Sequence, residues 1–234
     1  MQGIKMKKTN VNNVSIVIPA HNEEKNIPPI IKRISKSIPD VEIIIVDDHS
    51  TDNTQEIIKR LQKKYKTLRL LKKKGPKGKT TSLLQGFVAS KGDILVMIDA
   101  DLQYPPEAIP RMIKQIEEDK ADIVIAKRIM RLTLRSFFSH CFTSLFGRLL
   151  LGIPASDIQT GEKVFRREVI DSISITSKSW GFDIEFLYKA KEKGYKIAEI
   201  PIAFSQRAGG ATKVNVLYTI YDLALTSFKL MILH

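Results

Sequence analysis

Ile94-Leu-Val-Met-Ile-Asp-Ala-Asp-Leu-Gln103 is the stretch that decides the fold. Its first five residues are apolar and do not alternate with polar ones, which is typical of a strand buried on both faces of a parallel sheet. Asp99, Asp101 and Gln103 follow, before Pro105-Pro106 ends the element. In open α/β sheets, ligands bind beyond the carboxyl ends of the strands. The stretch therefore predicts a ligand site at the tip of a central strand.

The side chains at this tip are hard oxygen ligands. Such ligands suit Mg²⁺ or Mn²⁺, which usually bind one or two carboxylates together with substrate phosphates. The stretch accordingly indicates a metal–diphosphate site. An isolated Asp-x-Asp is more often a polar loop, so the assignment depends on the rest of the chain.

Composition limits the fold and the partners. A chain of 234 residues with 43% hydrophobic residues fits one domain with a substantial core. The net charge of +13 predicts an anionic partner, which is a nucleic acid, a nucleotide or a phosphate-bearing membrane surface. The single cysteine, Cys141, cannot form an internal disulfide and fits a reducing cytosol. We expect neither a signal peptide nor a clear membrane-spanning helix, because no suitable apolar run is present.

The first half of the chain alternates between strand and helix patterns. Residues 14–18 and 42–46 read as strands, and each is followed by polar residues and an amphipathic helix. Asp47 and Asp48 end the second strand, where a carboxylate can bind a base or a ribose hydroxyl. One of the two could instead cap the next helix, for which Asn53, with Glu56 three residues on, is also a candidate cap. This alternation predicts a nucleotide-binding α/β half.

A lysine-rich loop, residues 72–81, follows the third predicted strand at 68–71. Gly78-Lys79-Thr80 suggests a phosphate-binding P-loop, but that motif needs a glycine where Lys73 stands. The lysines could serve as counter-charges for a diphosphate ahead of the next helix, or simply form a solvated basic loop.

The second half carries further strands, among them a short one at 163–165, and four segments of interest. Residues 136–151 predict an aromatic helix, and several arginines precede it in the chain. Such a helix suits either a membrane interface or packing against the sheet. Asp183 and Glu185 lie at the start of a predicted helix. They could be catalytic carboxylates, or first-turn acids that the helix dipole favours. The strand at 196–204 contains Pro201 and should lie at an edge or bulge. Residues 214–233 predict a helix with one polar stripe, which would lie on a membrane, pack on the body or begin a membrane region.

Four motifs in order resemble a known family. They are Val17-Ile-Pro-Ala-His-Asn-Glu23, Val46-Asp-Asp-His-Ser-Thr-Asp-Asn-Thr54, Met97-Ile-Asp-Ala-Asp-Leu-Gln103 and Arg207…Thr212-Lys213. Together they resemble the inverting family 2 glycosyltransferases of GT-A fold, and within these the polyprenyl-phosphate glycosyltransferases such as dolichyl-phosphate mannose synthases. The resemblance implies an α/β domain over residues 1–213, with an open, mostly parallel sheet flanked by helices. An amphipathic, membrane-associated helix over residues 214–234 would follow.

The resemblance also implies a role for individual positions. The nucleotide-binding residues would be Pro19, His21, Glu23, Val46, Asp48, Asp99 and Ala100. His21 stands where a tyrosine is common in the family. Asp101 and Gln103 would hold Mg²⁺ or Mn²⁺. Arg128, Arg207 and Lys213 would meet the donor and acceptor phosphates, and with Asp101 they form the implied catalytic set.

The implied reaction is metal-dependent, inverting sugar transfer from GDP-mannose or a UDP-hexose to a polyprenyl (dolichyl-type) phosphate. We expect the chain to be cytoplasmic and peripheral on the membrane face, with no nucleic-acid partner. A phosphomonoester has a second pKa near ~6 and needs cations rather than a general base. A hydroxyl acceptor, as in polysaccharide or glycolipid synthesis, would need a base such as Asp183 or Glu185. A basic nucleic-acid-binding module is a remote alternative, because neither a reading helix nor an aromatic platform accompanies the basic residues.

Overall fold

The computed structural model describes residues 13–129, 148, 150–177, 180–205 and 216–232, with only the backbone described at 216–221. Seven strands in these residues form one sheet, in the order β3-β2-β1-β4-β6-β5-β7. The strands are β1 (Val14–Ala20), β2 (Glu42–Asp47), β3 (Leu68–Lys72), β4 (Ile94–Ile98), β5 (Ile123–Ile129), β6 (Glu162–Arg166) and β7 (Ile197–Ala203). Only β6 runs antiparallel to its neighbours. The predicted open, mostly parallel sheet is confirmed.

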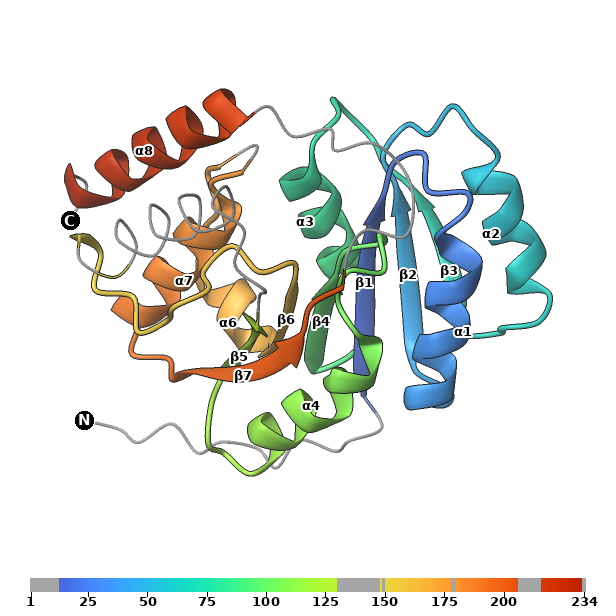
Figure 1. The fold of residues 1–234 in the computed structure, drawn as a ribbon, viewed down its shortest axis with the longest axis horizontal. Helices are drawn as coiled ribbons and strands as arrows, with labels where there is room; N and C mark the ends of the chain where they lie inside the picture. Colours follow the sequence, from blue (N-terminus) through green and yellow to red (C-terminus); the bar gives the residue numbers. More distant parts are fainter. Residues whose placement is uncertain (1–12, 130–147, 149, 178–179, 206–215, 233–234) are drawn as a thin grey trace.

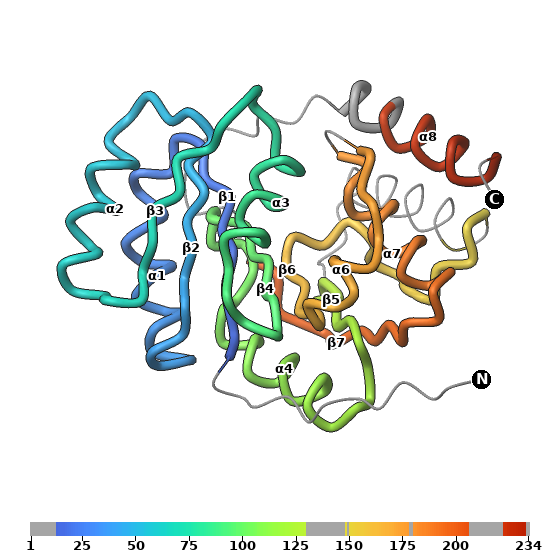
Figure 2. Tube along the Cα trace, turned by 180° about the vertical axis from the view of Figure 1, so that it is seen from behind, coloured from blue at the N-terminus to red at the C-terminus, as the bar shows by residue number. Residues whose placement is uncertain are grey.

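Helices cover both faces of the sheet (Figures 1 and 2). One face packs against α1 (Ile27–Ser37), α2 (Thr54–Gln62), the 3-10 turn η1 (Pro106–Ala108) and α4 (Ile109–Glu117). The other face packs against α3 (Lys79–Ala89), α6 (Arg167–Ser172), α7 (Phe182–Glu192) and α8 (Val216–Ile232). α6 had no counterpart in the sequence prediction. Each layer has its own hydrophobic core, so the sheet is apolar on both sides.

β4 lies at the centre, as the opening stretch predicted. All five of its residues are buried. Ile94, Val96 and Ile98 belong to the core under α1 and α4, whereas Leu95 and Met97 belong to the core under α3 and α7. A strand buried on both faces needs apolar residues at every position, which explains why no polar alternation is seen.

β6 joins the two halves of the sheet, because it pairs with β4 on one side and with β5 on the other. All five of its residues are buried, although its sequence is Glu-Lys-Val-Phe-Arg. Glu162 lies on the side of Val164, and Lys163 lies on the side of Phe165. Three ionisable side chains therefore sit inside the fold at this junction.

The C-terminal helix α8 packs against α7 (Figures 1 and 2). Asp222, in its predicted polar stripe, accepts hydrogen bonds from the backbone N–H groups of Trp180 (2.9 Å) and Gly181 (3.1 Å), just before α7 begins. A carboxylate is favourable at this end of a helix. Apolar side chains near the end of α8 face outward, with exposed fractions of 61% for Phe228 and 65% for Ile232. No helix in the described ranges has both the length and the apolar character needed to cross a bilayer.

Three sequence-based expectations need comment. β7, which contains Pro201, is an edge strand as predicted. Asn53 is the N-cap residue of α2, as predicted, but its side chain makes no cap hydrogen bond and donates to Glu24 instead. Asp52 supplies such a bond by accepting from the N–H of Thr54 at 3.0 Å. Of the predicted aromatic helix at 136–151, only residues 148, 150 and 151 are among the described ones.

Candidate active site

A cleft of about 450 Å³ lies beyond the carboxyl ends of the parallel strands. This volume is in the usual range for a small-molecule site. Its lining comes from the ends of β1 and β5, from the loops that follow β1, β2, β4 and β7, from the loop before β6, and from the starts of α3 and α7. The residues are Pro19, Ala20, His21, Glu23, Asp48, Lys79, Asp99, Ala100, Asp101, Gln103, Tyr104, Arg128, Gln159, Trp180, Asp183 and Phe204. The strand ends thus bring together segments far apart in the sequence, as ligand sites in α/β sheets require.

Asp99, directly after β4, is held from two sides. Its carboxylate forms an ion pair with Lys79 at 2.5 Å, and its N–H donates to the carbonyl of Gly161 at 3.2 Å. Burial opposes the charge on Lys79, but the facing Asp99 and Asp183 outweigh it and raise the pKa of that amine. A Cβ at Gly161 would lie 2.1 Å from Asp99 Oδ2, so a larger residue there would displace this carboxylate.

Asp101 and Gln103 form a tight turn after Asp99. Asp101 is only 7% exposed, and its Oδ1 accepts the N–H of Gln103 at 3.2 Å. Leu102 between them adopts φ 64°, a conformation uncommon for residues other than glycine. The Gln103 amide donates from Nε2 to the carbonyl of Ser205 at 3.4 Å. This turn presents a carboxylate and an amide to the same cleft.

The described residues contain no group of three or more His, Cys, Asp or Glu side chains suited to holding a metal ion. The donor set at the turn therefore consists of one carboxylate and one amide beside Asp99. That set fits Mg²⁺ or Mn²⁺, which keep most of their coordination sites for water and substrate phosphates. It does not fit a closed structural metal site, which needs a full set of protein ligands.

Asp48, after β2, is fixed by the lysine-rich loop. Its Oδ1 accepts from Lys73 Nζ at 2.8 Å and its Oδ2 from the N–H of Gly78 at 2.9 Å. His21 Nδ1 lies 2.8 Å from the Asp48 carbonyl oxygen. Lys73 stands where a P-loop would have glycine. Its amine binds the Asp48 carboxylate and the carbonyl of Gly78, and so holds the loop beside the cleft.

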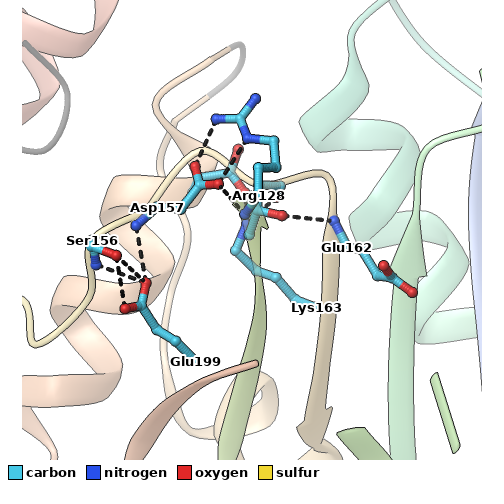
Figure 3. A network of polar contacts seen from close by, with 8 residues as sticks. Arg128, Ser156, Asp157, Glu162, Lys163 and Glu199 are labelled. Carbon is cyan, nitrogen blue, oxygen red and sulfur yellow. Dashed lines mark hydrogen bonds and ion pairs between the residues drawn. The ribbon is translucent and has the colours of Figure 1, made fainter. Parts of the chain in front are cut away.

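Arg128, near the end of β5, is likewise held by an ion pair, here with Asp157 (Figure 3). Its guanidinium donates to both carboxylate oxygens of Asp157, at 2.7 and 2.6 Å, and stacks over Phe204 with 5.3 Å to the ring centroid. Glu199 in turn accepts from the N–H of Asp157 at 3.0 Å and from Ser156. Burial disfavours the charged guanidinium, but Asp157 more than compensates and raises the pKa of Arg128.

The two acids at the start of α7 lie in different surroundings. Asp183 lines the cleft and forms a buried ion pair with Lys163. Glu185 points elsewhere and accepts from Thr176, Ser177 and Lys189. Burial alone would raise the pKa of Glu185, but these hydrogen bonds, led by that from Lys189, hold it at about 2. Glu185 is therefore a structural first-turn acid, and only Asp183 remains available for chemistry.

Most of the sequence-predicted site residues come together. Those lining the cleft are Pro19, His21, Glu23, Asp48, Asp99, Ala100, Asp101, Gln103 and Arg128. Val46 does not: its side chain is buried under α3, where a Cβ added at Gly86 would lie 3.0 Å from it. It is the residue before Asp47, and its direction follows from the alternation of the strand. Arg207 and Lys213 lie outside the described residues.

Several lining residues had no assigned role in the sequence analysis. They are Tyr104, Gln159, Trp180 and Phe204, and Lys79 was predicted only as part of a basic loop. Trp180 is the only tryptophan and stands three residues before Asp183, which was a usable signal. Tyr104 follows Gln103 directly and is buried, and burial raises its pKa to about 12. Gln159 and Phe204 carry no local pattern that marks them.

Sequence comparison identifies relatives of this chain. A family model described as "Glycosyl transferase family 2" matches residues 15–174. A "Dolichol-phosphate mannosyltransferase" of Pyrococcus furiosus is 30% identical over 230 residues, which cover 93% of this chain and 63% of that protein. An "Undecaprenyl-phosphate mannosyltransferase" of Micrococcus luteus is 28% identical over 215 residues, covering 86% of this chain and 87% of the relative. The chain thus spans less than two thirds of the Pyrococcus protein.

Structure comparison agrees with this. Glucosyl-3-phosphoglycerate synthase from Mycobacterium tuberculosis, crystallised with Mg²⁺ and uridine diphosphate, superposes with a TM-score of 0.76 at 22% identity. The match covers 94% of this chain and 79% of that one. At this identity the likeness shows the fold, which is the GT-A arrangement. With a family model matching more than half of its length, the chain belongs to glycosyl transferase family 2.

Proposed function

We propose that this chain transfers a sugar, with inversion, from a nucleotide-sugar donor to a polyprenyl phosphate, and that the transfer depends on a divalent metal ion. The observation that carries the proposal is the tip of β4. Asp99 and Asp101 lie there in one cleft with Asp48 and Arg128, in a chain of glycosyl transferase family 2. Names of the relatives support the sugar and acceptor classes, because two of them are mannosyltransferases of dolichol or undecaprenyl phosphate.

Different residues of the cleft bind the donor and stabilise the charge that develops during transfer. Asp48, already fixed by Lys73, faces the nucleoside end with Pro19 and His21. Asp101 and Gln103 would hold Mg²⁺ or Mn²⁺, which supplies positive charge to the diphosphate leaving group. Arg128 is preorganised by Asp157, so it can stabilise the developing negative charge without first losing side-chain freedom.

The acceptor follows from the charge at the site. A phosphomonoester is largely ionised at neutral pH and needs cations to hold it rather than a base. Arg128 is the cation on the cleft wall for this purpose, and Arg207 and Lys213 are proposed to complete it. Attack by the phosphate oxygen on the anomeric carbon, opposite the leaving diphosphate, inverts that carbon.

The acceptor's lipid chain requires access from a membrane. The end of α8 exposes Phe228, Met231 and Ile232, and Leu150 is exposed as well. The chain also carries a net charge of +13, which attracts anionic headgroups. We therefore place the chain on the cytoplasmic membrane face as a peripheral protein, bound through this apolar end.

A second candidate is transfer to a hydroxyl group. One observation favours it: Asp183 lines the cleft and is paired with Lys163, so a carboxylate is available as a general base. Asp183→Asn separates the two acceptors. The phosphate acceptor predicts that this variant stays far more active than Asp101→Ala, and a hydroxyl acceptor predicts that both are equally inactive.

The proposal is tested by transfer from GDP-mannose or UDP-glucose to a polyprenyl phosphate with Mn²⁺ present. Asp101→Ala should lower turnover by at least about a hundredfold, because a main metal ligand is lost. Asp93→Ala is the matched control, since Asp93 precedes β4 at the opposite end and is exposed. Wild-type activity in Asp101→Ala, with a chelator present, would refute the metal site.

A further inference from the structure

Lys163 is a lysine that is wholly buried, with 0% of its side chain exposed, in the middle of β6. Its amine donates to the carbonyl of Thr160 at 2.5 Å and to Asp183 Oδ1. Lys163 itself does not line the cleft, so it lies behind the residues that do.

Stability alone is a weak reason for this lysine. Removing two charges from water costs several kcal/mol per ion, and a buried pair rarely gains more than a well-packed apolar residue would. Burial accordingly lowers the pKa of Lys163, and Asp183 opposes that effect. Phe165, on the same face of β6 as Lys163, and the α7 residue Phe186, which packs against Phe165, are apolar and fully buried. An apolar residue would therefore suit this position if packing were its purpose.

The partner of the lysine supplies a better reason. Asp183 lies in the first turn of α7, with its carboxylate in the cleft. The other cleft carboxylate nearby, Asp99, has Lys79 as its partner. Lys163 reaches Asp183 from inside the protein, on the side away from a ligand, and so does not compete with that ligand for the cleft.

From this arrangement we infer that Lys163 is a positioning residue, which holds the Asp183 carboxylate aimed at the hydroxyl groups of the sugar in the cleft. The inference rests on the proposed function, because it needs a nucleotide sugar there. A charged carboxylate is a pure acceptor and takes hydrogen bonds from two neighbouring hydroxyls. Without Lys163, the Asp183 carboxylate would lose the buried contact that fixes its direction.

The same helix offers a matched control. Glu185 and Lys189 form a second carboxylate–lysine pair on α7, at 2.5 Å, which faces residues 174–177 instead of the cleft. Deleting Lys189 removes a similar pair from the same element. It tests whether a loss of activity comes from α7 as a whole or from Asp183.

The experiment is a double-mutant cycle with Lys163→Met, Asp183→Asn and the double variant, and with Lys189→Met as the control. The kcat/KM for GDP-mannose is measured with polyprenyl phosphate and Mn²⁺, and melting temperatures are recorded. We expect Lys163→Met and Asp183→Asn each to lose about tenfold in kcat/KM, and the double variant to lose no more than Asp183→Asn alone. Lys189→Met should melt earlier but keep kcat/KM within about twofold.

Other results overturn the inference. If the double variant loses about a hundredfold, the two residues act independently and Lys163 is merely structural. If Lys163→Met does not fold, the double variant serves instead, because it leaves no unpaired buried charge. A kcat/KM about tenfold lower in the double variant than in Asp183→Asn would also show that Lys163 acts independently of Asp183. A wild-type chain that transfers no sugar refutes the proposed function and the inference with it. An active wild type with independent losses refutes the inference alone.

Discussion

At the scale of single residues, the cations in and behind the cleft are already partnered. Among the residues that the structure describes, Lys73 pairs with Asp48, Lys79 with Asp99, Arg128 with Asp157 and Lys163 with Asp183. Such pairs fix the direction of each carboxylate and each cation before a ligand arrives. Binding therefore needs little reorganisation, which is the main condition for electrostatic stabilisation in a site.

Gly161→Ala tests the close approach that positions Asp99. The added methyl group would overlap the Asp99 carboxylate and lie 2.9 Å from Tyr104 Cε2, so the carboxylate must move away from Lys79. We expect binding of UDP or GDP with Mn²⁺, measured by calorimetry, to weaken by about tenfold or more. Gly194→Ala is the control, because Gly194 has φ +83° and no neighbour within 4 Å. It should lower stability by roughly 1 kcal/mol without affecting nucleotide affinity. Equal affinity in both variants would contradict this role of Gly161.

Glu162 should make stability depend on pH. Neither carboxylate oxygen has a hydrogen-bond partner among the described residues, and burial, with a contribution from Glu107, raises its pKa to about 8. The unfolded chain loses this proton near pH 4.5, whereas the folded chain keeps it until about pH 8. The folded state thus binds more protons between these values, and the free energy of unfolding falls by up to about 1.4 kcal/mol per pH unit as pH rises.

Glu162→Gln removes that dependence, because a glutamine resembles the protonated acid and does not titrate. We expect the variant to match the wild type near pH 4.5 and to exceed it increasingly up to about pH 8. Urea unfolding at a series of pH values measures the difference. A difference that stays constant over this range would show that Glu162 is charged in the folded protein.

The residues at the strand ends could be predicted from sequence, but their partners could not. Asp48, Asp99 and Asp101 lie within three residues of the end of an apolar run, and parallel strands bring such ends to one edge of a sheet. The partners come from 20 to 29 residues away: 25 for Lys73 and Asp48, 29 for Arg128 and Asp157, and 20 for Lys163 and Asp183. No periodicity in one sequence records such contacts.

At the scale of elements, α8 departs from the usual amphipathic arrangement. Part of its polar stripe faces the protein, since Asp222 holds the backbone before α7 and Thr226 is buried. Phe228, Met231 and Ile232 are exposed instead. The sequence predicted the helix, whereas positions 215 and 219 of the predicted stripe lie outside the residues whose side chains are described. The direction of the stripe could not be predicted, because that depends on the unsatisfied N–H groups that Asp222 caps.

The outward apolar end of α8 should contribute to membrane binding. The double change Phe228→Ser and Met231→Ser should weaken binding to vesicles containing anionic lipid by about tenfold, because buried apolar area is lost. Val88→Ser is the control, since Val88 is 88% exposed on α3. Nucleotide affinity, measured by calorimetry, should not change in either variant. Undiminished sedimentation with vesicles would argue that another surface binds the membrane.

The element boundaries show where local patterns suffice. β4 was predicted residue for residue, because five consecutive apolar residues flanked by aspartates leave little choice. β6 was predicted only as a short strand at 163–165, and its antiparallel direction was not foreseen. Its first two residues, Glu and Lys, are typical of a solvent-exposed segment. Only the pairing with β4 and β5 explains why the strand is buried.

At the scale of the whole molecule, the seven-stranded sheet consists of two parts that meet through β6. β3, β2, β1 and β4 form the part with Asp48 and Asp101, while β5 and β7 form the part with Arg128 and Phe204. The family resemblance predicted the layers and the mostly parallel order. It did not predict that buried ionisable residues would form the junction. Their burial depends on neighbours from both parts of the sheet.

This junction has a consequence for the folding reaction. β6 lies between two strands that both precede it in the chain, so the sheet closes only when long-range contacts form, and such contacts slow folding. Insertion of β6 must also dehydrate Glu162 and Lys163, so we expect this step to limit the folding rate. Until it occurs, the two walls of the cleft are not held together. The chain should therefore gain nucleotide affinity in the same kinetic phase in which it gains its tertiary structure.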